Sequence, residues 1–168
     1  MLFPTLEFAL FFLFVLGVAW SIYRKPNAHR FFLLVASYVF YGFWNWRYCF
    51  LLFALSAVAW LVAKLMMAKK FELSPKWYLG VGISFFVLVL IYYKYTGFLI
   101  ESFQSLMIWF DPNSTLSIVD NPILPLGISF ITFHAISLLF DAYRQKLKQA
   151  PSLVNVLLYV SFFPQLIA

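Results

Sequence analysis

Residues 83–93 read ISFFVLVLIYY and residues 8–20 read FALFFLFVLGVAW, two nearly unbroken apolar runs that decide the fold class. A strand of a membrane β-barrel would instead alternate apolar and polar residues over about ten positions. The chain has 168 residues, of which 64% are hydrophobic and only 11% charged, whereas soluble domains carry about 25% charged residues. This composition excludes a soluble globular domain, a disordered tail and a disulfide-stapled secreted module. It predicts an all-α integral membrane protein.

Six apolar runs are candidates for membrane-spanning helices, since a span needs about 20 residues at about 1.5 Å of rise each. They are residues 6–23, 31–46, 48–63, 77–93, 121–140 and 153–168. The second run would be only about 24 Å long as a helix, so a re-entrant hairpin is the alternative to two helices joined by a tight turn at residues 41–48. We expect residues 102–110 to form a short helix in the membrane interface. No repeat or linker divides the sequence, which predicts a single transmembrane domain over residues 1–168.

The distribution of basic residues predicts how the chain is oriented. If the spans alternate in direction, ten of the twelve Lys and Arg residues fall on one side, and Arg47 and Lys94 fall on the other. Cytoplasmic loops of membrane proteins are enriched in Lys and Arg, so we expect a multi-pass protein of about six spans with its N-terminus outside. These loops explain the net charge of +6 without a nucleic-acid partner. Basic residues follow the first run rather than precede it, which indicates an uncleaved span and not a signal peptide.

His134 is the clearest candidate for chemistry, because an ionisable group inside a span is costly to bury. The sequence has no P-loop, dinucleotide-binding, zinc-protease or nucleophile-elbow motif. At helical spacing, His134 shares a face with Gly127, Phe130, Ser137 and Asp141, and we expect this face to point into the bundle. The functional interpretation makes His134 a general base or a group in a substrate tunnel. The structural interpretation, which we favour, is a histidine hydrogen-bonded to a neighbouring helix beside small residues.

The other candidates receive structural interpretations. Lys94 lies among tyrosines, where its side chain can reach the membrane interface; a transport role is the alternative. We expect Asp141 and Arg144 to pair at a helix end, and His29 to face water or lipid headgroups. Cys49, the single cysteine, is expected to fill space, since it has no disulfide partner and no Cys-x-x-Cys spacing. We predict no metal site and no bound cofactor.

Three stretches of the chain match a known pattern in order and approximate spacing. They are residues 34–44 (LVASYVFYGFW), 121–144 (NPILPLGISFITFHAISLLFDAYR) and 162–168 (FFPQLIA). Together they resemble the membrane-bound O-acyltransferase family, and the branch for bacterial alginate O-acetylation is more similar than the D-alanyl transfer branch. The resemblance implies an enzyme that passes an acyl group, commonly acetyl, across the bacterial inner membrane to hydroxyls of an extracytoplasmic polysaccharide such as alginate. The donor would be a cytoplasmic acyl thioester such as acetyl-CoA, and extracytoplasmic partner proteins would complete the transfer.

The chain also departs from the family pattern. Family members are several hundred residues long, with their hallmark histidine in the second half, and their equivalent of residues 163–168 continues into Gly-Pro. This sequence stops there, inside an apolar run. We therefore expect the N-terminal portion of such an enzyme, inactive alone, with no catalytic residue in this chain and its cofactor-binding residues unknown; His134 does not replace the hallmark histidine.

Two other functions remain open on the sequence alone. One is a transporter or channel subunit that uses His134, Asp141 and Lys94 as intramembrane relay groups. The other is a non-catalytic membrane scaffold that docks an extracytoplasmic partner on residues 98–120.

Overall fold

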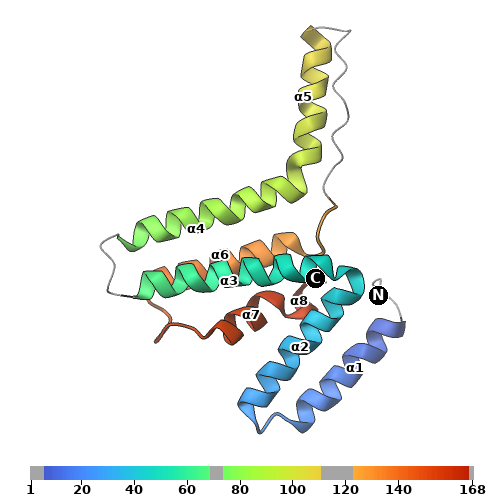
Figure 1. Cartoon of the computed structure of the whole chain (residues 1–168), viewed down its shortest axis with the longest axis vertical. Helices are drawn as coiled ribbons and strands as arrows, with labels where there is room; N and C mark the ends of the chain where they lie inside the picture. The colour runs from blue at the N-terminus through green and yellow to red at the C-terminus, as the bar shows by residue number, and fades with distance from the viewer. Residues whose placement is uncertain (1–5, 69–73, 111–122, 167–168) are drawn as a thin grey trace.

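The computed structural model describes residues 6–68, 74–110 and 123–166, and in these ranges it contains helices and no strand (Figure 1). The helices are α1 (Leu6–Ser21), α2 (Pro26–Asn45), α3 (Arg47–Met67), α4 (Pro75–Leu90), the π-helix η1 (Ile91–Tyr95), α5 (Thr96–Phe110), α6 (Ile128–Tyr143), α7 (Leu153–Ser161) and α8 (Phe163–Leu166). The predicted all-α class is confirmed.

The second predicted run forms a longer helix than expected. Helix α2 begins at Pro26, five positions before the apolar run, because proline lacks the amide hydrogen that is unused at the first helical position and its fixed φ suits that position. Its 20 residues reach about 30 Å. The predicted tight turn is confirmed and consists of Trp46 alone, where the Asn45 side chain accepts a hydrogen bond from the Arg47 amide at 3.1 Å.

The fourth run does not end at residues 94–97 as we predicted. The prediction of a separate interfacial helix at residues 102–110 is also wrong. Helices α4, η1 and α5 follow one another without a break, so that Pro75–Met107 is one apolar helix of 33 residues. Gly97 does not end the helix, since it lies inside α5 (Thr96–Phe110). The Thr96 hydroxyl donates to the Tyr92 carbonyl one turn earlier. The π-turn at η1 is where α5 changes direction relative to α4 in Figure 1, as π-bulges commonly do.

The last two predicted runs are also corrected. Helix α6 starts at Ile128 rather than at residue 121, because Gly127 adopts a left-handed φ of 67° directly before it; residues 121–122 lie outside the described ranges. The run 153–168 is not one helix, since α7 has 9 residues and is followed by Phe162, whose ψ of 109° is not helical. A continuous helix would force the Pro164 ring against the carbonyl four residues earlier.

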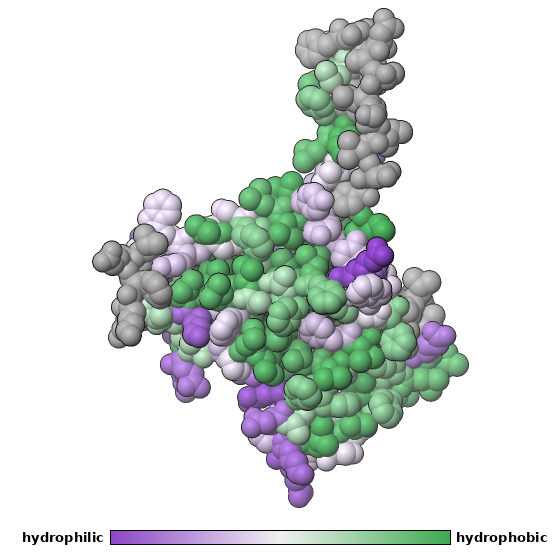
Figure 2. Space-filling view, viewed as in Figure 1, coloured by the Kyte–Doolittle hydropathy of each residue, from purple (hydrophilic) through white to green (hydrophobic). Residues whose placement is uncertain are grey.

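Two described helices, Arg47–Met67 and Pro75–Met107, are long and apolar enough to cross a membrane. Three shorter apolar elements accompany them: Leu6–Ser21, Ile128–Tyr143 and the broken element α7–α8 over Leu153–Leu166. Figure 2 shows that apolar side chains cover most of the visible surface, as expected for helices that face lipid. The number of six spans and their orientation stay predictions.

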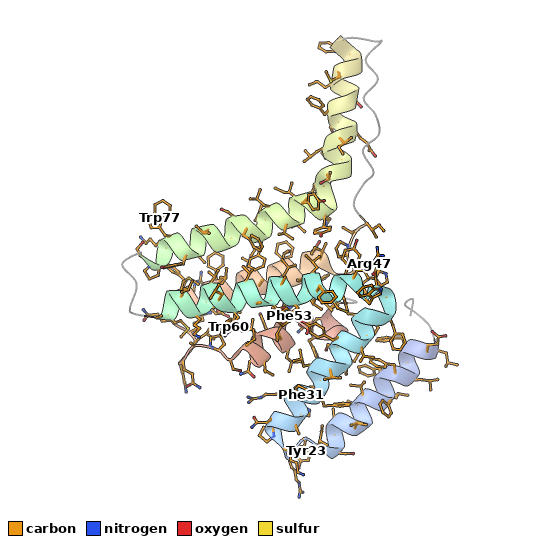
Figure 3. All side chains as sticks on the ribbon, in the orientation of Figure 1. Tyr23, Phe31, Arg47, Phe53, Trp60 and Trp77 are labelled. Atoms are coloured by element: carbon orange, nitrogen blue, oxygen red, sulfur yellow. The ribbon has the colours of Figure 1, made fainter. Side chains whose placement is uncertain are left out.

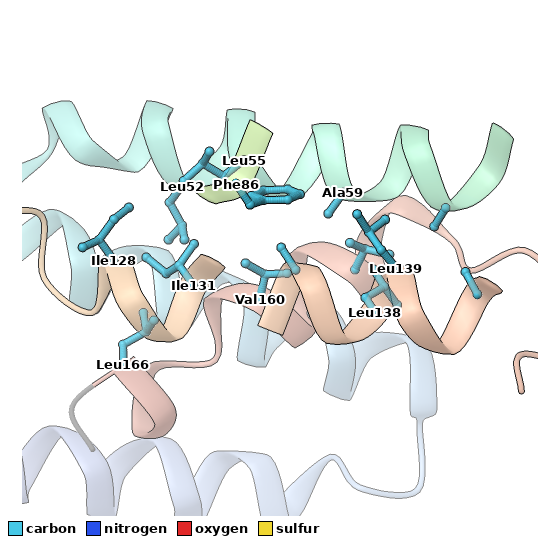
Figure 4. Close-up of a cluster of buried hydrophobic side chains, with 14 of the residues drawn as sticks. Leu52, Leu55, Ala59, Phe86, Ile128, Ile131, Leu138, Leu139, Val160 and Leu166 are labelled. Atoms are coloured by element: carbon cyan, nitrogen blue, oxygen red, sulfur yellow. The ribbon is translucent and has the colours of Figure 1, made fainter. Parts of the chain in front are cut away.

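The core lies where α3, α4, α6 and α7 meet. Its buried side chains include Leu55 of α3, Phe86 of α4, Leu139 of α6 and Val160 of α7 (Figure 4). Small residues allow this close packing, since a Cβ on Gly82 would lie 2.5 Å from the Leu139 side chain. Membrane helices use small residues in the same way, because close backbone approach maximises van der Waals contact.

Two groups of contacts mark two ends of the bundle. At what we call the basic end, Arg30 of α2 donates to the side chain of Asn155 in α7 at 3.4 Å, and the Trp60 indole donates to the Pro151 carbonyl at 3.1 Å. At what we call the aromatic end, the Tyr48 ring lies 6.4 Å from that of Tyr93. Figure 3 labels Tyr23 and Arg47, which flank the two ends of α2.

Candidate functional site at the motif junction

The structure brings the three resembling stretches together, although they are far apart in the sequence. We call this site the motif junction and define it by residues from each stretch: Ser37, Tyr41, Leu126, Gly127, Phe163 and Leu166. It joins α2, the segment that precedes α6, and the broken helix α7–α8.

Gly127 is the tightest point of the motif junction. Its φ of 67° is a left-handed conformation that glycine adopts at little cost and that costs other residues roughly 1–2 kcal/mol. A Cβ at this position would lie 2.9 Å from the Leu166 carbonyl oxygen and 3.3 Å from the Leu166 Cα. Both neighbours are backbone atoms, so α8 would have to move to admit any side chain.

Two tyrosine hydroxyls secure the non-helical segment before α6. The Tyr41 hydroxyl donates to the Leu126 carbonyl at 2.9 Å, and the Tyr48 hydroxyl donates to the Ile123 carbonyl at 2.8 Å. Tyr41 is 1% exposed. Non-helical backbone at membrane depth needs such partners, because lipid offers no hydrogen bonds. The α2–α3 hairpin therefore holds the start of α6 in place.

Ser37 links α2 to the broken helix. Its hydroxyl donates to the Leu33 carbonyl at 2.8 Å and accepts from the Phe163 amide at 3.3 Å. The Phe163 ring lies in an aromatic cluster, 5.4 Å from the ring of Phe11 and 5.5 Å from that of Phe40. The break at Phe162 frees the Phe163 amide, and the fully buried Ser37 hydroxyl accepts its hydrogen bond.

An apolar pocket of about 300 Å³ lies beside the motif junction. Its walls come from α1, α2 and the break in α7–α8, including Val15, Leu33 and Phe162. With only apolar side chains in its lining, the pocket suits a hydrocarbon group and offers no group for acid–base chemistry.

His134 does not lie on an inward face, which corrects the prediction. Phe130 and Ser137 of the predicted face are exposed and His134 is half-buried, while the buried face of α6 carries Ile131, Ala135 and Leu139. The His134 Nδ1 contacts the Phe130 carbonyl oxygen at 2.7 Å, and the ring packs edge-on against Tyr159 at 5.4 Å. A carbonyl only accepts, so Nδ1 is the donor in this hydrogen bond.

The remaining candidates are not assembled into one site. The predicted Asp141–Arg144 pair is wrong: Asp141 pairs with Lys146 at 3.6 Å, and the Arg144 guanidinium lies 6.0 Å from the Phe140 ring centre. Lys94 lies in η1 over the Tyr95 ring at 5.6 Å, at the opposite end of the bundle from Asp141.

The other two candidates have local surroundings. His29 is half-buried in the first turn of α2. Cys49 is half-buried, and its thiol lies 3.7 Å from the Tyr38 carbonyl. Of residues 98–120, the predicted docking segment, residues 111–120 lie outside the described ranges.

The described residues contain no group of three His, Cys, Asp or Glu side chains close enough to hold a metal ion. The six residues that define the motif junction include no histidine or carboxylate, and their contacts join helices. Sequence reasoning missed the roles of Ser37, Tyr41 and Gly127. The available signal was that each lies in one of the three resembling stretches.

Comparison with known proteins identifies relatives of this chain. The chain is 32% identical over 148 residues to the probable alginate O-acetylase of Azotobacter vinelandii, in an alignment that covers 87% of this chain and 29% of that protein. It is 33% identical over 138 residues to the probable alginate O-acetylase of Pseudomonas aeruginosa, covering 81% and 26%. It is 32% identical over 169 residues to the peptidoglycan O-acetyltransferase of Helicobacter pylori, covering 86% and 31%.

The chain belongs to the membrane-bound O-acyltransferase family. The resemblance predicted from the three stretches is confirmed. Within this family, the chain spans between 26% and 31% of the length of these three relatives. No protein-family model matches the chain. No solved structure matches it either.

Proposed function

We propose that the chain is part of a membrane-bound O-acyltransferase that moves acyl groups, most simply acetyl, across the bacterial inner membrane. The donor is a cytoplasmic acyl thioester such as acetyl-CoA, and the acceptors are hydroxyls of an extracytoplasmic polysaccharide. The observation that carries the proposal is the motif junction: the three stretches that mark the family meet in one place. The relatives named as alginate and peptidoglycan O-acetyltransferases support acetyl as the group and a polysaccharide as the acceptor class.

The segregation of charge supports an orientation for this enzyme. Arg24, Lys25 and Arg30 lie around the start of α2, and Lys64, Lys146 and Lys148 lie near the ends of α3 and α6. Because cytoplasmic loops are enriched in Lys and Arg, we place the basic end in the cytoplasm and the N-terminus outside. Six apolar elements then cross or enter the membrane, with α7–α8 as a broken element rather than a full span.

The chain supplies the positioning part of this function. The described residues offer His134 with no acidic or nucleophilic partner at hydrogen-bond distance, so we assign no catalytic residue to them. Since the chain spans at most 31% of these three relatives, we propose that acyl transfer needs the rest of such an enzyme, together with extracytoplasmic partner proteins that hand the acyl group to the polysaccharide. The chain alone should be inactive.

The proposal is tested by the O-acetyl content of cell-surface polysaccharide. A strain that lacks the full gene should lose O-acetyl ester from one polysaccharide, and the full gene should restore it. Gly127→Ala, which disturbs the motif junction, should restore much less, whereas Gly80→Ala should restore fully, since a Cβ at Gly80 meets no atom within 4 Å. Unchanged ester content in the deletion strain, with the full protein expressed in its parent, would refute the proposed function.

The orientation has a test of its own. Cysteines placed in a Cys49→Ala background at residues 25 and 148 should react only with a membrane-permeant maleimide in intact spheroplasts. A cysteine at residue 46 should react with an impermeant one. The opposite labelling pattern would invert the topology and leave the acyltransferase proposal to the ester assay.

A further inference from the structure

A cavity of about 720 Å³ lies at the basic end of the bundle, away from the motif junction. The end of α3, the start of α4 and the segment after α6 form its walls, with Met67, Pro75, Tyr78, Tyr143, Gln145 and Lys148 among its lining residues. Its size falls in the range of small-molecule sites, about 300–1,000 Å³. The lining combines aliphatic side chains with tyrosine, amide and ammonium groups, which suits an amphiphilic ligand.

Gln145 lines this cavity in a strained backbone conformation. Its φ is 57°, and it is the only non-glycine residue with positive φ in the described ranges. It follows the C-terminus of α6, where its amide donates to the Ala142 carbonyl at 3.2 Å and the Lys146 amide donates to the Asp141 carbonyl at 3.0 Å. Glycine is the residue usually found at such a position. A strained residue in a site is an observation from which a functional role can be inferred.

Lys148 provides positive charge to the cavity lining without an acidic partner in the described part of the chain. Two other cations of the basic end are engaged: Lys146 pairs with Asp141 at 3.6 Å, and the Lys64 ammonium lies 4.7 Å from the Trp60 ring centre. The N-terminus of α4 adds partial positive charge, since Pro75 lines the cavity and Ser74 makes no side-chain capping bond.

We propose that this cavity binds an anionic phosphate ester, with the Lys148 ammonium and the Gln145 side-chain amide contacting the phosphate and the aliphatic wall contacting the adjoining carbon chain. A lipid such as phosphatidylglycerol carries this chemistry, and so does coenzyme A. The proposal concerns binding by the described residues and does not rest on acyl transfer.

Binding is measured on the full protein, delipidated in a non-ionic detergent, by titration calorimetry with two probes. One is dihexanoyl phosphatidylglycerol, with the zwitterionic dihexanoyl phosphatidylcholine as reference, and the other is coenzyme A. Lys148→Gln should weaken binding of the anionic probe about fivefold. This fold-change corresponds to the free energy of about 1 kcal/mol that one cation contributes near an anionic lipid. Lys25→Gln removes the same charge from the same end but does not line the cavity, and it should leave the affinity unchanged.

Gln145→Gly separates a built site from general attraction to a basic surface. It leaves the net charge unchanged and relieves the strained φ, so the melting temperature of the protein should rise while binding of the probe weakens at least threefold. Loss of affinity for phosphatidylglycerol in both variants assigns the site to a lipid headgroup; loss for coenzyme A alone assigns it to a soluble phosphate ester. If Gln145→Gly binds both probes as well as the parent does, or if neither probe binds, the proposal is wrong.

Discussion

Replacing Gly127 by alanine tests the motif junction at its tightest point. The substitution adds one methyl group to a residue with φ of 67°. The left-handed conformation costs alanine roughly 1–2 kcal/mol. The new Cβ would also lie 2.9 Å from the Leu166 carbonyl oxygen, and overpacking of this kind costs about 1–3 kcal/mol. We therefore expect Gly127→Ala to lower the free energy of unfolding by about 2–5 kcal/mol, the sum of the two costs.

The assay is thermal unfolding of the full protein in detergent, followed by fluorescence-detected gel filtration. Gly80→Ala is the matched control, because a Cβ there meets no atom within 4 Å in the middle of α4, and alanine favours a helix over glycine by about 0.5–1 kcal/mol. The two substitutions should therefore shift the melting temperature in opposite directions.

A third variant separates the two costs. Asparagine tolerates the left-handed conformation but still carries a Cβ, so Gly127→Asn should remain destabilised by the contact with Leu166. If Gly127→Asn has the same melting temperature as the parent protein, α8 does not approach residue 127 as closely as the structure shows. If Gly127→Ala itself is as stable as the parent, both terms of the reasoning are refuted.

Three further substitutions probe single interactions. Tyr41→Phe removes the donor to the Leu126 carbonyl and should cost about 1–3 kcal/mol of unfolding free energy, while Tyr92→Phe at an exposed ring should cost little; equal melting temperatures would contradict the buried hydrogen bond. Phe163→Ala empties a ring site that is 2% exposed and should cost about 3 kcal/mol, against under about 0.5 kcal/mol for Phe50→Ala, which is 70% exposed. His134→Asn keeps a side-chain donor for the Phe130 carbonyl and should retain polysaccharide O-acetylation by the full enzyme; loss of the ester with a normal melting temperature would make Nε2 a reacting group.

The features that follow from composition and periodicity could be predicted from sequence. Continuous apolar runs gave the helical class, and the turn at Trp46 was expected from its aromatic and polar neighbours. These features are local: hydrophobic run length and interfacial residues act on each segment separately. The gathering of basic residues at one end also follows from local rules, since each loop is counted by itself.

The features that depend on tertiary partners could not be predicted. Gly97 looked like a helix end, yet the helix continues through η1 into α5. The break at Phe162 needs the Ser37 hydroxyl to accept the Phe163 amide, and Ser37 is far away in the sequence. The inward face assigned to His134 failed for a similar reason: several faces of α6 have apolar residues, and packing against α3 and α4 selects one of them.

The residues that define the motif junction are glycine, serine, leucine and aromatic residues, and they include no acid, lysine, arginine or histidine. Non-helical backbone inside a membrane is tolerated only where protein groups satisfy it, and Ser37 and Tyr41 do so here. We therefore expect such residues to act on how much protein folds and not on the chemical step. Substitutions at the junction should therefore lower O-acetylation in proportion to the amount of folded enzyme. A Tyr41→Phe enzyme that folds fully but transfers tenfold less per molecule would instead place the junction in the path of the acyl group.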